Sequence, residues 1–115
     1  MNTRSLGNLG EQIAAAYLKS HGYSIIEANV RTPFGEVDLL ARAKDGTLVF
    51  AEVRSRSSTR FGSAKESISR DKLQHMIKSA QYIWQRRFVG QRFRLDLISI
   101  DGKAVTGHTR NIELN

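Results

Sequence analysis

The chain has 115 residues, of which 40% are hydrophobic, and this suits one domain (1–115) built around one core. The lack of cysteine in the sequence excludes disulfides and thiolate zinc sites. The N-terminal residues lack a signal-peptide core, and no apolar run approaches the roughly 18 residues that a membrane span needs. We therefore expect a cytoplasmic protein with no membrane partner.

The net charge of +7 is distributed unevenly along the sequence. Residues 54–94 hold eleven of the eighteen Lys and Arg residues but two acids, Glu66 and Asp71, so this segment carries +9. Such asymmetry favours a polyanionic partner, and nucleic acid is the first candidate. The alternatives are a solvated surface that only aids solubility, or a basic face that binds an acidic protein.

The first predicted elements are a helix and three strands. Helical spacing predicts a helix over 5–21, closed by Gly22, with an apolar stripe formed by Leu6, Leu9, Ile13, Ala16 and Tyr17. Apolar segments bounded by turn residues then predict strands over 23–31, 36–42 and 48–56.

The second half of the chain begins with a polar stretch without periodicity, 56–67, which predicts a mobile loop. Ser69 can then cap a helix that continues to about Phe88, with core spacing at Leu73, Met76, Ile77, Ala80 and Trp84. Strands over 92–100 and 104–114 complete the prediction.

The element order αβββαβ(β) predicts an α/β fold with a mixed sheet flanked by helices. A strand, helix, strand crossover normally joins parallel neighbours, so the third and fourth strands should pair in parallel. The third strand then lies inside the sheet, and the basic loop leaves its carboxyl end. Such strand ends are where open α/β sheets usually bind ligands.

Two acids lie in apolar strands of a predicted hairpin, Asp38 before the turn at 44–46 and Glu52 after it. A two-residue loop would place them on opposite faces, whereas a three-residue loop with a left-handed Gly46 places Asp38 directly opposite Glu52. We adopt the second register. The Cβ atoms would then be about 5 Å apart, and both carboxylates could bind one divalent cation. Arg54 follows Glu52 on the same face of its strand.

Glu11 begins a face of the first helix that continues with Ala14, Ala15 and Leu18. These residues are small enough to let the helix approach the sheet closely. Spacing alone favours a simpler interpretation, in which a first-turn glutamate stabilises the helix dipole.

Short strings over nearly the whole chain resemble one protein family. They are G-x-x-G-E at 7–11, Y-L-x-x-x-G-Y at 17–23, N-x-R at 29–31, G-E-V-D-L-L at 35–40, E-V-R-S-R at 52–56 and R-L-D-L-I at 94–98. In this order they resemble the YraN family, a small bacterial family similar to the PD-(D/E)xK nucleases and, among these, to the archaeal Holliday junction resolvases. The resemblance implies a single nuclease-like domain with a restriction-endonuclease-like fold.

The resemblance also implies roles for four residues. Glu11, Asp38 and Glu52 fall on the family's acidic positions, and Arg54 falls where its catalytic lysine is expected. Magnesium or manganese held by Asp38 and Glu52 would compensate phosphate charge and make hydroxide available near neutral pH, while Glu11 would bind a second ion or a water ligand of the first. The implied activity is endonucleolytic cleavage of DNA, with branched DNA as substrate and a homodimer as one form of the protein.

Arg54 departs from the family pattern. Arginine stays protonated in proteins and cannot act as a base, although it can bind a phosphate through two hydrogen bonds. Water activation would then fall to the metal alone or to Lys72, reaching in from the second helix. The alternative function is a catalytically silent nucleic-acid-binding module that keeps the nuclease fold.

Other charged and aromatic residues are weaker candidates. Phosphate contacts are expected from Arg31, Arg56, Arg60, Lys65 and Lys72. Glu36 could support the cation site, although an exposed glutamate beside a turn is commoner. Asp96 is expected to pair with Arg94 or Arg31 in a structural role. Helical spacing assigns Tyr82, Trp84 and Phe88 to the core rather than to base stacking, and the three histidines show no ligand spacing.

Overall fold

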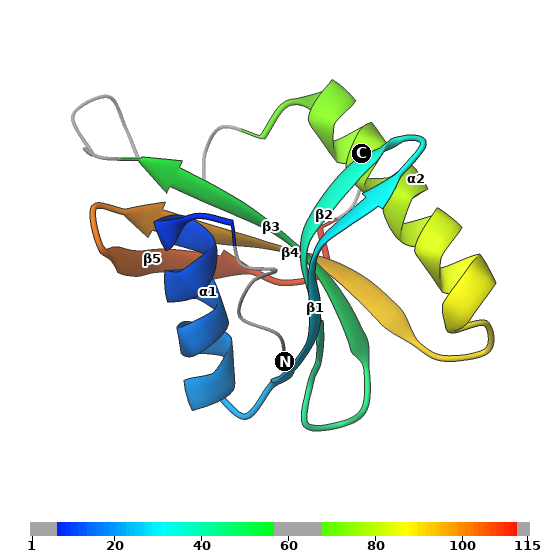
Figure 1. Ribbon diagram of the computed structural model, residues 1–115, viewed down its shortest axis with the longest axis horizontal. Coiled ribbons are helices and arrows are strands. Elements are labelled where there is room, and N and C mark those ends of the chain that lie inside the picture. Colours follow the sequence, from blue (N-terminus) through cyan, green and yellow to red (C-terminus); the bar gives the residue numbers. More distant parts are fainter. Residues whose placement is uncertain (1–6, 57–67, 113–115) are drawn as a thin grey trace.

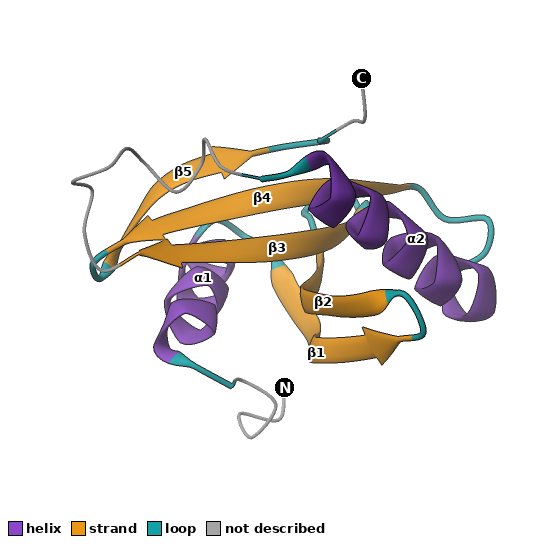
Figure 2. Cartoon of the chain, turned by 90° about the horizontal axis from the view of Figure 1, so that it is seen from above, coloured by secondary structure: helices purple, strands orange, loops and turns teal. Residues whose placement is uncertain are grey.

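The structure is a computed structural model that describes residues 7–56 and 68–112. One five-stranded sheet, in the order β1-β2-β3-β4-β5, has one helix packed on each face (Figures 1 and 2). The β3–β4 pair is parallel and the other neighbouring pairs are antiparallel, which confirms the predicted mixed α/β fold. The elements are α1 (Leu9–Ser20), β1 (Ser24–Thr32), β2 (Gly35–Arg42), β3 (Leu48–Arg56), α2 (Arg70–Arg87), β4 (Phe93–Asp101) and β5 (Ala104–Thr109).

Helix α1 begins at Leu9, because the Asn8 side chain accepts a hydrogen bond from the Glu11 amide at 2.8 Å. The predicted start at residue 5 lies outside the described residues. The predicted apolar stripe is wrong at Leu9, which is 56% exposed, and at Ala16, which is also exposed, whereas Ile13 and Tyr17 are partly buried against the core. The helix instead buries its small-residue face, formed by Glu11, Ala14, Ala15 and Leu18.

The small residues of α1 matter because this helix lies close to the sheet. Gly10 has no side chain, and a Cβ atom there would clash with the Ser55 hydroxyl on β3. The close approach brings the first turn of α1 beside the carboxyl end of β3.

Helix α2 is capped by Ser69, as predicted, whose hydroxyl accepts from the Lys72 amide at 3.1 Å. Its buried face contains Leu73, Met76, Ser79, Ala80 and Ile83. Trp84 and Ile77, which were expected in the core, are only partly buried. Neither described helix is long and apolar enough to cross a bilayer.

The strand boundaries agree closely with the predicted ones except for β5, which ends at Thr109 rather than at residue 114. The chain turns off the sheet at Asn111, which has a left-handed φ of 54°. The amide of Asn111 donates to the Asp96 carboxylate at 3.1 Å, and the Ile112 amide donates to the Leu95 carbonyl at 2.7 Å. The loop predicted over 56–67 lies almost wholly outside the described residues.

The hairpin of β2 and β3 has the register of the three-residue loop. Gly46 has φ +91°, and the Ala43 amide donates to the Thr47 carbonyl at 2.9 Å. The ladder runs from the pair Arg42–Leu48 to the pair Leu39–Ala51, and Asp38 and Glu52 are the next residues on that register. The register prediction is confirmed.

Strands β1 and β2 reverse their faces together near their middle, so that side chains which would regularly point to one core point to the other. Ala28 and its partner Leu39 belong to the core on the α1 side, whereas Val30 and its partner Val37 belong to the core on the α2 side. Residues two apart in a regular strand share a face, so the ribbon reverses between these pairs. Asn29, with a left-handed φ of 54°, lies at the reversal. Figure 2 shows the resulting bend of β1 and β2 away from β3 and β4, and Asp38 lies at this bend.

Candidate active site

Four carboxylates from three elements surround one concave region: Glu11 of α1, Glu36 and Asp38 of β2, and Glu52 of β3. Glu11, Asp38 and Glu52 line a hollow of ≈ 430 Å³. Glu36 lines one adjoining hollow with Glu11 and another with Glu52. The structure therefore brings together the three predicted acids and adds Glu36.

Glu11 is 5% exposed and its position is fixed by hydrogen bonds. Its Oε1 atom accepts from the Gly7 amide at 2.8 Å and from the Asn29 side-chain nitrogen at 3.0 Å. Glu11 is thus more than a first-turn glutamate beside a helix dipole, because the residue at the bend of β1 holds it toward the other acids. Sequence reasoning missed Asn29, whose one signal was its place in the N-x-R string.

Asp38 is held by the backbone of β3, where the Val53 amide donates to Oδ2 at 2.8 Å. Burial and the neighbouring Glu52 carboxylate raise the pKa of Asp38 to about 7, against the lowering effect of that hydrogen bond. Glu11 and Glu36 make smaller contributions to the same rise. The region is therefore short of positive charge at neutral pH, which is the condition that a bound cation relieves.

Glu52 is 5% exposed and pairs with a basic side chain. Burial raises its pKa, and this is opposed by Lys72, by Arg54 and by a hydrogen bond with Asp38. The Lys72 Nζ lies 3.3 Å from Oε2 of Glu52. This ion pair connects the first turn of α2 to β3 and places a lysine amine at the carboxylates.

The structure describes the side chains of two of the five predicted phosphate-binding residues. Arg31 forms an ion pair with Glu36 at 3.6 Å, with its side chain 89% exposed, and Lys72 pairs with Glu52. Arg56 is the last residue of β3, and its side chain lies outside what the structure describes. Arg60 and Lys65 also lie outside the described residues.

A cation-binding group can be built from Glu11, Glu36 and Asp38, each of which offers one oxygen within 4.8 Å of the others. Oxygen ligands of Mg²⁺ or Ca²⁺ lie about 2.0–2.6 Å from the ion, and hence roughly 4–5 Å apart across it. The spacing and the all-oxygen donor set therefore fit a hard divalent cation. This group differs from the expected trio by containing Glu36 in place of Glu52, whose Oε2 is paired with Lys72.

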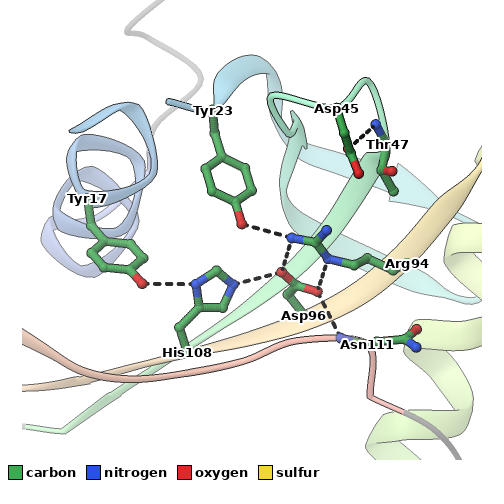
Figure 3. A network of polar contacts seen from close by, with 8 residues as sticks. All are labelled: Tyr17, Tyr23, Asp45, Thr47, Arg94, Asp96, His108 and Asn111. Carbon is green, nitrogen blue, oxygen red and sulfur yellow. Dashed lines mark hydrogen bonds and ion pairs between the residues drawn. The ribbon is translucent and has the colours of Figure 1, made fainter. Parts of the chain in front are cut away.

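A second polar cluster surrounds Asp96, which is fully buried on the α1 side of the sheet (Figure 3). Its carboxylate accepts from Arg94 Nε at 3.0 Å and from the Asn111 amide at 3.1 Å, and contacts His108 Nε2 at 2.7 Å. Burial alone would raise the pKa of Asp96, but the hydrogen bonds with His108, Arg94 and Asn111 outweigh it and lower that pKa. The predicted pairing with Arg94 is confirmed.

The Asp96 cluster extends to α1 and to Tyr23, the residue before β1. His108 Nδ1 lies 2.9 Å from the Tyr17 hydroxyl, and Arg94 donates to the Tyr23 hydroxyl at 2.8 Å. The cluster thereby ties α1 and the residue before β1 to β4 and β5, and its role is structural. The sequence carried no sign of His108, because its partners are distant along the chain.

The fold and the site define a mixed α/β protein with a carboxylate cluster at the bend of its sheet, beside basic side chains. The sequence profile described as "Uncharacterised protein family UPF0102" matches residues 10–100, and the chain belongs to this family. The YraN-type resemblance drawn from the motifs is thereby confirmed at the level of the family.

Curated relatives match over most of their length. A UPF0102 protein from Persephonella marina is 45% identical over 95 residues, which cover 82% of this chain and 81% of the relative. One from Syntrophomonas wolfei is 40% identical over 112 residues, covering 94% and 96%. One from Caldicellulosiruptor saccharolyticus is 40% identical over 101 residues, covering 87% and 85%.

Proposed function

We propose that this protein is a nuclease of the PD-(D/E)xK type that hydrolyses nucleic-acid phosphodiesters with magnesium or manganese. The substrate in this proposal is DNA, and branched DNA follows from the likeness of the motifs to the resolvases. The observation that carries the proposal is the carboxylate cluster, in which burial and Glu52 raise the pKa of Asp38 to about 7 while Lys72 and Arg54 stand beside it.

The cation would be held by Asp38 with Glu11 and Glu36, and by Glu52 after release from Lys72. When bound, a divalent ion stabilises negative charge on the phosphate and lowers the pKa of water. The protein's own part is to fix the ligands: the Val53 amide holds Asp38, and Asn29 holds Glu11. Such hydrogen bonds to ligand carboxylates orient them for binding.

In this proposal Arg54 and Lys72 together perform the two roles expected of one catalytic lysine. Arg54 stays protonated, so its part is to bind the phosphate and neutralise its developing charge. A lysine, unlike an arginine, is able to act as a base in proteins, and the Lys72 amine lies 3.3 Å from Oε2 of Glu52. In this proposal Lys72 orients or deprotonates the attacking water. The Lys72 side chain on α2 therefore supplies the function that Arg54 cannot perform.

The test is a magnesium titration of the purified protein, followed by calorimetry and by nicking of supercoiled and branched DNA. We expect binding heat and cleavage in the wild type, and loss of both in Asp38→Asn. Lys72→Met should reduce cleavage about a hundredfold or more, the usual contribution of general acid or base catalysis, and leave magnesium binding intact. Arg54→Lys keeps the charge and adds a group that can activate water, so it should raise cleavage and rescue Lys72→Met in part.

A catalytically silent binding module is the second candidate, and Arg54 at the lysine position is the observation that favours it. In that case neither the wild type nor Arg54→Lys would cut DNA or RNA in magnesium or manganese, although both would bind. Size-exclusion chromatography with and without a four-way junction tests the proposed homodimer.

A further inference from the structure

A cleft of ≈ 450 Å³ lies between the β1–β2 turn and the outer side of α2. This volume falls in the range of about 300–1,000 Å³ typical of small-molecule sites. The β1–β2 turn contributes Phe34. The side chains from α2 that line the cleft are Lys78, Gln81, Tyr82, Gln85 and Arg86.

The cleft presents aromatic and guanidinium groups to its opening. Phe34 is 43% exposed, and its ring centroid lies 6.2 Å from that of Tyr82, at 71°. The Arg86 Cζ lies 3.7 Å from the centre of the Tyr82 ring. Tyr82, which was expected in the core, is partly buried against it and also lines this cleft, where its ring lies beneath the Arg86 guanidinium group.

The cleft continues toward the carboxylates. Phe34 also lines the hollow of ≈ 220 Å³ that contains Glu36, Glu52 and Lys72. Along α2, Lys72 and Tyr82 are ten residues apart, which corresponds to about 15 Å of helix. One strand of nucleic acid could therefore pass from the carboxylates to the cleft over a few nucleotides.

The chemistry of the lining selects among occupants. No carboxylate lines the cleft among the described residues, while Lys78 and Arg86 supply positive charge. Bases stack on aromatic rings and on arginine guanidinium planes, and the Gln81 and Gln85 amides can both donate to and accept from a base edge. An apolar peptide would leave these polar groups unpaired. A base inside a duplex could not enter, because its faces are covered by its neighbours.

We propose that this cleft binds an unpaired nucleobase of the strand whose backbone passes the carboxylates. The inference rests on the proposed function and adds a substrate class to it: nucleic acid with at least one unstacked base a few nucleotides from the reacting phosphate. Flaps, junction branch points and single strands belong to this class.

The test compares a labelled oligothymidylate with an abasic strand of the same number of phosphates, by fluorescence anisotropy in EDTA. The wild type should bind the thymidylate more tightly. Phe34→Ala and Arg86→Ala should each lower this preference about 5- to 150-fold, the contribution of one base stack. Arg86→Lys keeps the positive charge but lacks the planar guanidinium group, so it should also lose the preference for the thymidylate. Phe34→Trp keeps an aromatic ring and should keep that preference.

Val89→Ala is the matched control, because Val89 is 71% exposed and is not among the residues that line the cleft. Phe34 is exposed at a turn, so Phe34→Ala should fold, and thermal melting checks this. Equal wild-type affinity for the two strands, no binding of either, or an unchanged preference in Phe34→Ala and Arg86→Ala would each overturn the inference. Cleavage is measured separately in magnesium. A preference for the thymidylate without cleavage would contradict the proposed nuclease activity alone. Cleavage without that preference would contradict the proposed base binding in the cleft alone.

Discussion

Replacing Asp38 by asparagine should stabilise the metal-free protein at pH 8, which is unusual because most substitutions destabilise. The pKa of Asp38 is raised from 3.8 in a free carboxyl to about 7, mainly by burial and by Glu52. The folded protein therefore binds this proton more tightly than the unfolded chain does. Ionisation of Asp38 lowers the free energy of unfolding progressively from about pH 4 to about pH 7, and the full loss is present above pH 7.

The size of the effect follows from the shift. About three pKa units, at 1.36 kcal/mol each, set a ceiling of about 4 kcal/mol for the cost of the charge. Asparagine removes the charge and can still accept a hydrogen bond from the Val53 amide, although a neutral acceptor binds it more weakly, by roughly 1 kcal/mol. We expect a net gain of about 1–3 kcal/mol at pH 8, or about 4 °C in Tm for each kcal/mol. The gain should vanish at pH 4.

The assay is thermal melting of the wild type and Asp38→Asn at pH 4 and pH 8, in EDTA and in magnesium. Magnesium at a hundred times its Kd should stabilise the wild type by about 2.7 kcal/mol and leave Asp38→Asn nearly unchanged. Asp45→Asn is the control, because hydrogen bonds from Thr47 lower the pKa of this exposed turn acid, and its removal should bring no gain. An Asp38→Asn protein that melts no higher than the wild type at pH 8 would refute the reasoning.

Three further predictions concern other parts of the molecule. Asp96→Asn should destabilise the protein by about 3 kcal/mol in urea unfolding, since it leaves the partly buried Arg94 without its carboxylate, and an unchanged stability would contradict the structural role. Asn29→Ala should lower stability by about 2 kcal/mol, because it strains the left-handed backbone and removes a hydrogen bond, and Asn29→Gly should cost less. Removing Arg56, Arg60 and Lys65 together should reduce the salt slope of duplex DNA binding by about 2.7, and an unchanged slope would place the binding surface elsewhere.

The sequence was sufficient for the order of elements and for the β2–β3 register, because these depend on local patterns. A continuous apolar run from Leu48 to Ala51 marks β3, and Gly46 supplies the positive φ that a three-residue loop requires. The face of α1 was harder to predict. The prediction placed large apolar residues such as Leu9 on the buried face of α1. The structure buries Ala14 and Ala15 there, because small side chains let the helix pack closely on the sheet.

The bend of β1 and β2 could not be read from periodicity. A left-handed asparagine lies where the faces of the two paired strands reverse, and a register shift between Ile25 and Glu27 also interrupts the alternation of β1. For the same reason Glu36 was only a weaker candidate for the site, since its position relative to Glu11 depends on the bend. The structural role of His108 follows only from its contacts with Asp96 and Tyr17, which are distant in the sequence.

The bend also sets the charge that a phosphate meets at the carboxylates. The ionisable groups gathered there are Glu11, Glu36, Asp38, Glu52, Arg31, Arg54 and Lys72. With every group ionised their sum is −1, which repels a phosphate, and one divalent cation changes it to +1. The Phe34 and Arg86 cleft lacks such acids among its lining residues. Binding of a strand in EDTA should therefore report the cleft and the basic segment, while the gain on adding magnesium should report the carboxylates, and Asp38→Asn should remove that gain.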